Sequence, residues 1–200
     1  MVCKTRAPDK HLGKFLPREI MSHYLISHDN VIKFRQAIES MYRIYFVTEY
    51  AENGSLLDLI LEESYIDETR SRVWFRQLVD AVDYCHRIGV VHRDIRCDNL
   101  LFDGNYTLKL SNFGFARAQM LPGKVDGCYP LSDTYCGSYA YSAPEVIKGV
   151  PYYPQAADVW SMGVVLFAMV FGKLPFDDTN YPKLIKVSCQ GNYVFTKSIG

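Results

Sequence analysis

The chain has 200 residues, of which 48% are hydrophobic and 22% are charged, and its formal net charge is zero. This composition is typical of a globular protein with a sizeable core, and the charge balance gives no reason to expect nucleic acid or a membrane surface as the main partner. The six cysteines form no C-x-x-C motif, and the polar start MVCKTRAPDK does not resemble a signal peptide. Both features predict reduced thiols and a cytoplasmic location.

The first quarter of the chain predicts one helix and two strands. Residues 10–27 favour a helix, with Pro17 tolerated near its first turn or at a kink. Residues 32–40 and 42–50 are rich in β-branched and aromatic side chains, which favour strands. The Asn-Gly pair within residues 51–55 predicts a turn, and we expect a boundary between two lobes there.

The strongest helical pattern follows at residues 67–87, with acidic residues at its start and Gly89 beyond its end. Its apolar positions recur at helical spacing, and they are Trp74, Leu78, Ala81, Val82 and Cys85. The segment NLLFDGNYTLKL then predicts two short strands joined at Asp103-Gly104-Asn105.

The second half of the chain predicts a long loop and another helix. Residues 115–141 lack periodicity, and a loop of that length is usually functional or disordered. Helical character returns at residues 158–171. The apolar run Val164–Phe171 is too short to span a bilayer, so we expect a helix that is buried on all sides.

Polar motifs occur in an order that suggests phosphoryl transfer. His92-Arg93-Asp94 is followed by Asn99, then by Asn112-Phe113-Gly114, then by Ser142-Ala143-Pro144-Glu145 and by the segment at 158–163. Asp94 could accept a proton from a substrate hydroxyl, and Asn99 offers an amide oxygen to a metal ion. Each motif alone is weak evidence, whereas the order and spacing together indicate the catalytic lobe of a protein kinase.

The chain therefore resembles the eukaryotic protein kinases, and within them it is most similar to the testis-specific serine/threonine kinases. The resemblance implies a two-lobed α+β fold. Residues 1–50 would form a partial small lobe, truncated at its N-terminus, and residues 51–200 a partial large lobe, truncated at its C-terminus. Four segments carry the subfamily likeness: KFLPREI at 14–20, TYCGSYAYSAPEV at 134–146, DVWSMGVVLF at 158–167 and PFDDTN at 175–180.

By this resemblance, several positions would bind ATP. The αC glutamate and its lysine partner would be Glu19 and Lys4, although the spacing used by testis-specific kinases would put the lysine before Met1. The other nucleotide positions are the gatekeeper Thr48, the hinge backbone of Glu49 and Ala51, and the pocket floor at Leu101.

The resemblance also implies the catalytic and regulatory positions. Asp94 would be the catalytic aspartate, and Arg96 would contact the γ-phosphate where lysine is usual. Asn99 and Asn112 would hold Mg²⁺. The Cys136-Gly137-Ser138 segment favours serine or threonine in the protein substrate.

Thr134 matches the activation-loop phosphorylation site of these kinases. The resemblance implies that its phosphate would pair with Arg93. The alternative is an unmodified surface threonine.

Three departures leave two functions open. Asn112 replaces a metal-binding aspartate, no G-x-G-x-x-G motif lies upstream, and the final helices of the large lobe are missing, which would expose an apolar face. The first reading is a serine/threonine kinase that uses ATP and Mg²⁺ with impaired activity. The second is a pseudokinase that binds and regulates a protein partner.

Overall fold

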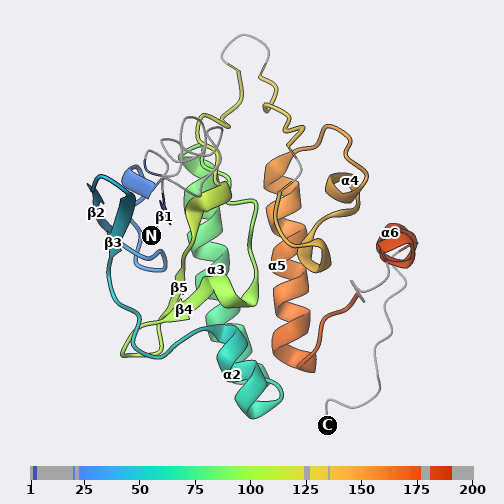
Figure 1. The fold of residues 1–200 in the computed structure, drawn as a ribbon. Coiled ribbons are helices and arrows are strands. Elements are labelled where there is room, and N and C mark those ends of the chain that lie inside the picture. The colour runs from blue at the N-terminus through green and yellow to red at the C-terminus, as the bar shows by residue number, and fades with distance from the viewer. Residues whose placement is uncertain are drawn as a thin grey trace.

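The computed structural model describes residues 2–3, 20, 23–123, 127–134, 136–176 and 181–190, in a mixed α+β arrangement (Figure 1). Lys4, Glu19 and most of the helix predicted at 10–27 lie outside the described residues. His23 and Tyr24 are helical, but Ile26 and Ser27 are not, because the chain has already turned toward the strands.

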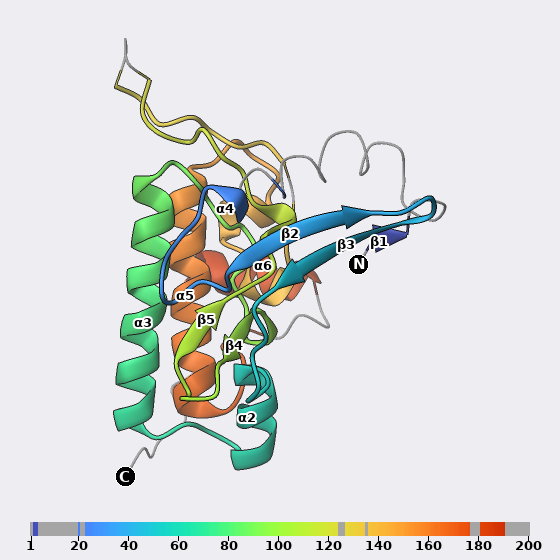
Figure 2. The same cartoon turned by 90° about the vertical axis from the view of Figure 1, so that its left-hand side faces the viewer.

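The two predicted strands of the small lobe are present and antiparallel. Strand β2 (Phe34–Glu39) pairs with β3 (Arg43–Thr48), and β1 (Val2–Cys3) adds to the other edge of β3. Ser40 closes the connection, since its N–H donates to the carbonyl of Arg43 at 2.8 Å. The β2–β3 hairpin projects from the helical part of the molecule (Figure 2).

A short helix that the sequence reading missed, α2 (Leu56–Glu63), follows the predicted turn. The Ser55 hydroxyl accepts the N–H of Asp58, and the Asp58 carboxylate accepts the N–H of Ser55, which together form a capping box. Helix α3 (Glu68–Arg87) confirms the strongest prediction, with Asp67 as its N-cap. Gly89 follows its end at a φ of +76°, a conformation that glycine adopts without strain.

Strands β4 (Leu100–Phe102) and β5 (Leu108–Leu110) form the predicted second hairpin. Leu100 and Phe102 are buried against the helices, while Leu101, between them, faces the other side and is partly exposed. This alternation directs Leu101 away from the main core. Its role as the floor of a nucleotide pocket stays a prediction.

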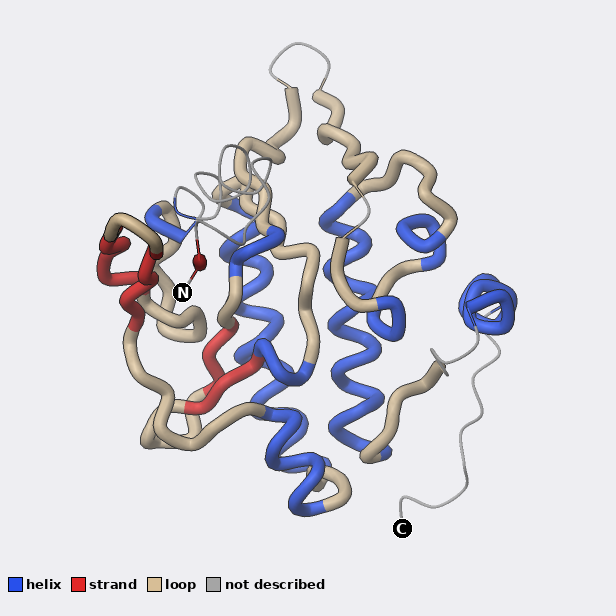
Figure 3. Tube along the Cα trace, viewed as in Figure 1, coloured by secondary structure: helices blue, strands red, loops and turns tan. Residues whose placement is uncertain are grey.

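The second half contains an irregular segment and the remaining helices. The predicted loop is confirmed over most of its length, with short 3₁₀ turns η3 (Phe113–Phe115) and η4 (Tyr139–Tyr141) at its two ends (Figure 3). The helices that follow are α4 (Pro144–Ile147), α5 (Pro154–Phe171) and α6 (Tyr181–Gln190). Helix α5 begins four residues before the predicted start at 158, because Pro154 can occupy the first helical position.

Helices α3 and α5 lie side by side and form the main core with the β4–β5 hairpin (Figures 1 and 2). The prediction that α5 is buried on all sides is wrong. Val159 is 60% exposed, and Leu166 and Val170 are only partly buried. These side chains line an open apolar groove of about 480 Å³ on α5.

Helix α5 also has the length and composition of a membrane-spanning helix, with a mean hydropathy of 1.4 over 18 residues. The core helix of a soluble protein passes the same test, and 44% of this window is buried within the protein. Its contacts with α3 and the hairpin make it a core helix of the domain.

Candidate active site

The loop that carries His92-Arg93-Asp94 is held by a residue of α5. The carboxylate of Asp158 accepts the backbone N–H of His92 at 2.9 Å and that of Arg93 at 2.7 Å. Arg93 has a φ of +68°, which is costly for a residue other than glycine. The buried carboxylate therefore fixes a strained backbone next to Asp94.

The buried ring of His92 also holds this loop, through two hydrogen bonds. Its Nε2 donates to the carbonyl of Ser111 at 2.9 Å, and its Nδ1 accepts the N–H of Asp94 at 3.2 Å. These two contacts require the neutral tautomer protonated on Nε2. Burial lowers the pKa of His92, which favours the same neutral form.

Asp94 is the buried carboxylate of this loop, with 8% of its surface exposed. Burial raises its pKa, although His92 and a hydrogen bond from Asn99 act in the opposite direction. Asn99, at the end of the 3₁₀ turn η2 (Cys97–Asn99), donates its Nδ2 to the Asp94 carbonyl at 2.8 Å and to Asp94 Oδ2 at 3.0 Å. The structure thus joins two of the predicted site residues directly.

Asn112 extends this network by one more hydrogen bond. Its Nδ2 donates to Oδ1 of Asn99 at 3.0 Å, and its backbone has a φ of +64°. Asparagine adopts this left-handed conformation more readily than most residues do. The predicted metal-site residues Asn99 and Asn112 therefore lie together, and in this structure they bind each other.

The donor set does not suit Mg²⁺. Magnesium prefers charged oxygen ligands, whereas Asn99 and Asn112 offer only neutral amides, and the amide hydrogens of Asn112 already occupy the Asn99 oxygen. Within the described residues, no group of three or more histidine, cysteine, aspartate or glutamate side chains could hold a metal ion. The predicted Mg²⁺ site at Asn99 and Asn112 is not supported by this geometry.

Arg96 lies beside Asp94 but pairs with another carboxylate. Its guanidinium donates two hydrogen bonds to Asp98 and one to the hydroxyl of Ser138. The pair is about one-third exposed on both sides, and the Asp98 contact raises the pKa of Arg96. Asp98 and Ser138 are contacts that sequence reasoning did not identify.

The predicted hinge lies between the end of β3 at Thr48 and the start of α2 at Leu56. The hydroxyl of Thr48 donates to the carbonyl of Glu49 at 3.1 Å, and the N–H of Glu49 donates to the backbone carbonyl of Lys33 at 2.9 Å. The Glu49 carboxylate instead pairs with Lys109 at 3.4 Å. Among the described residues, no hydrogen bond uses the N–H of Ala51, which leaves that donor for a ligand.

A row of aromatic ring contacts connects strand β2 to this site, and sequence reasoning missed its member His23. Phe113 lies between His92 at 4.7 Å and His23 at 4.6 Å, measured between ring centroids, and His23 stacks on Phe34 at 5.5 Å. Neither ring nitrogen of His23 has a hydrogen-bond partner in the part of the chain that the structure describes. Burial, and then repulsion from His92, lower the pKa of His23 to about 4.

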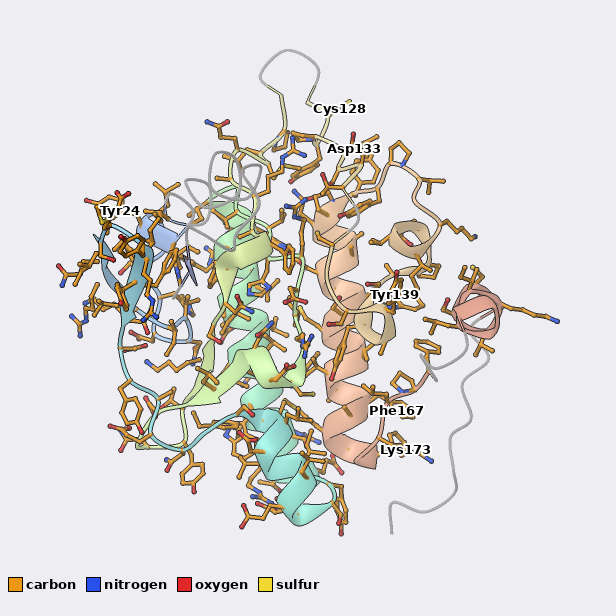
Figure 4. All side chains as sticks on the ribbon, viewed as in Figure 1. Tyr24, Cys128, Asp133, Tyr139, Phe167 and Lys173 are labelled. Atoms are coloured by element: carbon orange, nitrogen blue, oxygen red, sulfur yellow. The ribbon has the colours of Figure 1, made fainter. Side chains whose placement is uncertain are left out.

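The irregular segment brings Arg93 near Thr134 without a direct contact. Arg93 donates to the Ser132 hydroxyl at 3.2 Å and to the Phe115 carbonyl at 2.8 Å. The same Ser132 hydroxyl accepts the N–H of Thr134 at 3.4 Å, so Ser132 lies between the Arg93 guanidinium and the predicted phosphosite Thr134. The neighbouring Asp133 is labelled in Figure 4, at the upper part of this segment.

Gly137 lets this segment pass close to the catalytic loop. It has a φ of +92°, and a Cβ at this position would lie 2.9 Å from the carbonyl oxygen of Arg93 and 3.5 Å from Oδ1 of Asp94. Both the conformation and the spacing therefore require glycine.

Comparison with known proteins agrees with this geometry. Residues 1–197 match the protein kinase domain family, and the chain belongs to that family. It is 41% identical over 199 residues to human testis-specific serine/threonine-protein kinase 1, a match that covers 99% of this chain and 54% of that protein. It is 44% identical over 186 residues to mouse testis-specific serine/threonine-protein kinase 3, covering 92% and 67%.

A serine/threonine kinase outside the testis-specific group is also similar. The chain is 41% identical over 193 residues to the rat serine/threonine-protein kinase SIK1, which covers 96% of this chain and 24% of that protein. The chain spans about half the length of several curated relatives that it matches, such as human testis-specific kinase 1 at 54%. The predicted kinase fold and the predicted likeness to testis-specific kinases are both confirmed.

Proposed function

We propose that this chain binds ATP next to the hinge and transfers the γ-phosphate to a serine or threonine of a protein, more slowly than a kinase with a carboxylate at position 112. The observation that carries the proposal is the geometry of Asp94. Its carboxylate is buried, hydrogen-bonded to Asn99 and placed on a loop that Asp158 fixes.

Asp94 would orient the substrate hydroxyl and accept its proton. A raised pKa makes a carboxylate a better proton acceptor, and burial shifts the pKa of Asp94 in this direction. Arg96 supplies positive charge beside it and, once released from Asp98, could contact the γ-phosphate. Binding of the adenine would use the N–H of Ala51, which has no partner among the described residues, and the apolar surface of Leu101.

A second candidate function is supported by the Asn112–Asn99 hydrogen bond. This contact joins Nδ2 of Asn112 to Oδ1 of Asn99 without a cation, in a site that has no carboxylate at position 112 for a metal. That arrangement suits a pseudokinase, which would bind nucleotide and regulate a protein partner without transferring phosphate. The two functions differ in turnover and share the nucleotide pocket.

Phosphoryl transfer from labelled ATP to serine- and threonine-containing peptides, measured with the full-length protein, separates the candidates. We expect slow transfer, loss of transfer in Asp94→Asn with nucleotide binding kept, and a rise of roughly two to four orders of magnitude in Asn112→Asp. Transfer that is unchanged by Asp94→Asn would contradict the kinase proposal. Nucleotide binding without transfer in the wild-type protein would favour the pseudokinase.

A further inference from the structure

We propose that the amide of Asn112 takes the place of a metal ion in this site, so that the protein binds ATP without requiring Mg²⁺. The inference rests on the proposed nucleotide binding and concerns how that binding depends on cations. It is carried by the contacts of two asparagines, Asn99 and Asn112, and by the chemistry that the position between them allows.

The orientation of the Asn99 amide is set by its neighbours. Its Nδ2 lies 2.8 Å from the Asp94 carbonyl and 3.0 Å from Asp94 Oδ2, and both of these atoms only accept hydrogen bonds from it. The opposite orientation would place an oxygen against two acceptors. Oδ1 of Asn99 must therefore face Asn112.

The backbone fixes the separation of the two asparagines. The N–H and the hydroxyl of Ser111 both donate to the carbonyl of Asn99, each at 2.9 Å. Asn112 follows directly and is held in a left-handed conformation. Its side chain reaches Oδ1 of Asn99 at 3.0 Å.

The group at position 112 therefore lies where it can present positive potential to the Asn99 oxygen. Asn112 provides it through its amide hydrogens. An aspartate here would place an oxygen against an oxygen, a repulsive contact unless a cation lay between them. The asparagine thus completes the site with a hydrogen bond where an aspartate would need a metal ion.

The charge of the site also favours nucleotide binding without a metal ion. A nucleoside triphosphate without Mg²⁺ keeps its full negative charge, and a carboxylate at position 112 would repel it. The neutral Asn112 adds no such repulsion, and Arg96 lies near the same loop as a cation. Removing the metal should therefore weaken nucleotide binding much less here than in a site with an aspartate.

Binding of a fluorescent ATP analogue to the full-length protein tests the inference, with one titration in EDTA and one in excess Mg²⁺. We expect the wild-type Kd to differ by less than about threefold between the two conditions. Asn112→Asp should bind at least about tenfold more weakly in EDTA than in Mg²⁺. Asn105→Asp, the same change in an exposed turn, should behave as the wild type does.

The outcomes separate the inference from the function on which it rests. Wild-type binding that requires Mg²⁺, or metal-independent binding by Asn112→Asp, would overturn the inference and leave ATP binding intact. No binding in either condition would overturn both. Aspartate tolerates the left-handed backbone, and if Asn112→Asp still fails to fold, Asn112→Gly fits that φ, lacks the amide and should lose metal-free affinity.

Discussion

The carboxylate of Asp158 binds the backbone N–H of Arg93 at 2.7 Å, although 65 residues separate the two in the chain. Its other oxygen accepts the N–H of His92 at 2.9 Å and contacts Nε2 of His86 at 2.8 Å. A single side chain of α5 therefore connects this helix, the end of α3 and the loop that carries Asp94.

Asp158→Asn should destabilise the fold by about 3 kcal/mol, because the new NH₂ group would face backbone donors in a buried position. Chemical denaturation of both proteins measures the difference in free energy of unfolding. Asp83→Asn, which removes an exposed ion pair with Arg87 on α3, should cost less than about 1 kcal/mol. Equal losses in the two variants would show that the backbone contacts of Asp158 are not structural.

His23 should make stability depend on pH. Its pKa falls from 6.5 to about 4 in the folded state, so between these values the unfolded chain binds a proton that the folded chain does not. Stability should therefore decrease by about 3 kcal/mol as the pH falls from about 6.5 to 4, and this contribution should be constant above that range. Thermal denaturation across pH 4–8 measures it.

His23→Leu should remove most of that dependence and raise the melting temperature at pH 5, since the ring nitrogens of His23 lack partners among the described residues. His92 would still contribute, because burial lowers its pKa too. His28→Gln, a change at a more accessible histidine, serves as the control. A pH profile left unchanged by His23→Leu would contradict the assignment.

Phosphorylation of Thr134 should order the segment around Ser132. Arg93 already donates to Ser132, two residues before Thr134, and a phosphate could replace the hydroxyl as its partner. Mass spectrometry of protein from its native tissue should detect the phosphate. Protease resistance of the segment should rise on phosphorylation and should not rise in Arg93→Gln. Consistent absence of the phosphate in active protein would contradict this prediction.

The apolar groove on α5 should cause the 200-residue chain to bind hydrophobic dyes and to self-associate as its concentration rises. Val159, at 60% exposure, contributes to the groove and can be changed with little effect on the core. Val159→Lys should lower dye fluorescence and shift gel filtration toward the monomer. Val150→Lys, at an exposed apolar position outside the groove, should change neither. Weak dye binding and a monomer at all concentrations would argue against an exposed groove.

Sequence patterns predicted those elements whose signals are local. The strands at 34–39 and 43–48, the hairpin of β4 and β5, and α3 all have alternation or helical periodicity over enough residues to be recognised. Helix α2 was missed because eight residues show little periodicity, although the Ser55 and Asp58 pair was a usable capping signal. The exposed face of α5 could not be predicted, because burial depends on which elements pack against it.

The site could be predicted only in part, because the directions of its side chains depend on contacts that form in the folded chain. Motif order correctly grouped Asp94, Asn99 and Asn112, which the structure brings together. The direction of each amide could not be known from the sequence, since it depends on the acceptors of Asp94 and on the backbone angle at position 112. The pairing of Arg96 with Asp98 and the ring contacts of His23 likewise arise only in the folded chain.

Gly137 has a consequence for how tolerance to mutation should be distributed along the chain. The residue has no functional group, yet the backbone passes Arg93 and Asp94 at a distance that no side chain permits. In a scan of all single substitutions scored for phosphotransfer, position 137 should tolerate as few replacements as the aspartate beside it. In a parallel scan scored only for abundance, position 137 should tolerate more replacements, since displacing a partly exposed segment need not unfold the helices beneath it. Comparing the two scans would tell whether glycine at position 137 is needed for the chemistry or for folding.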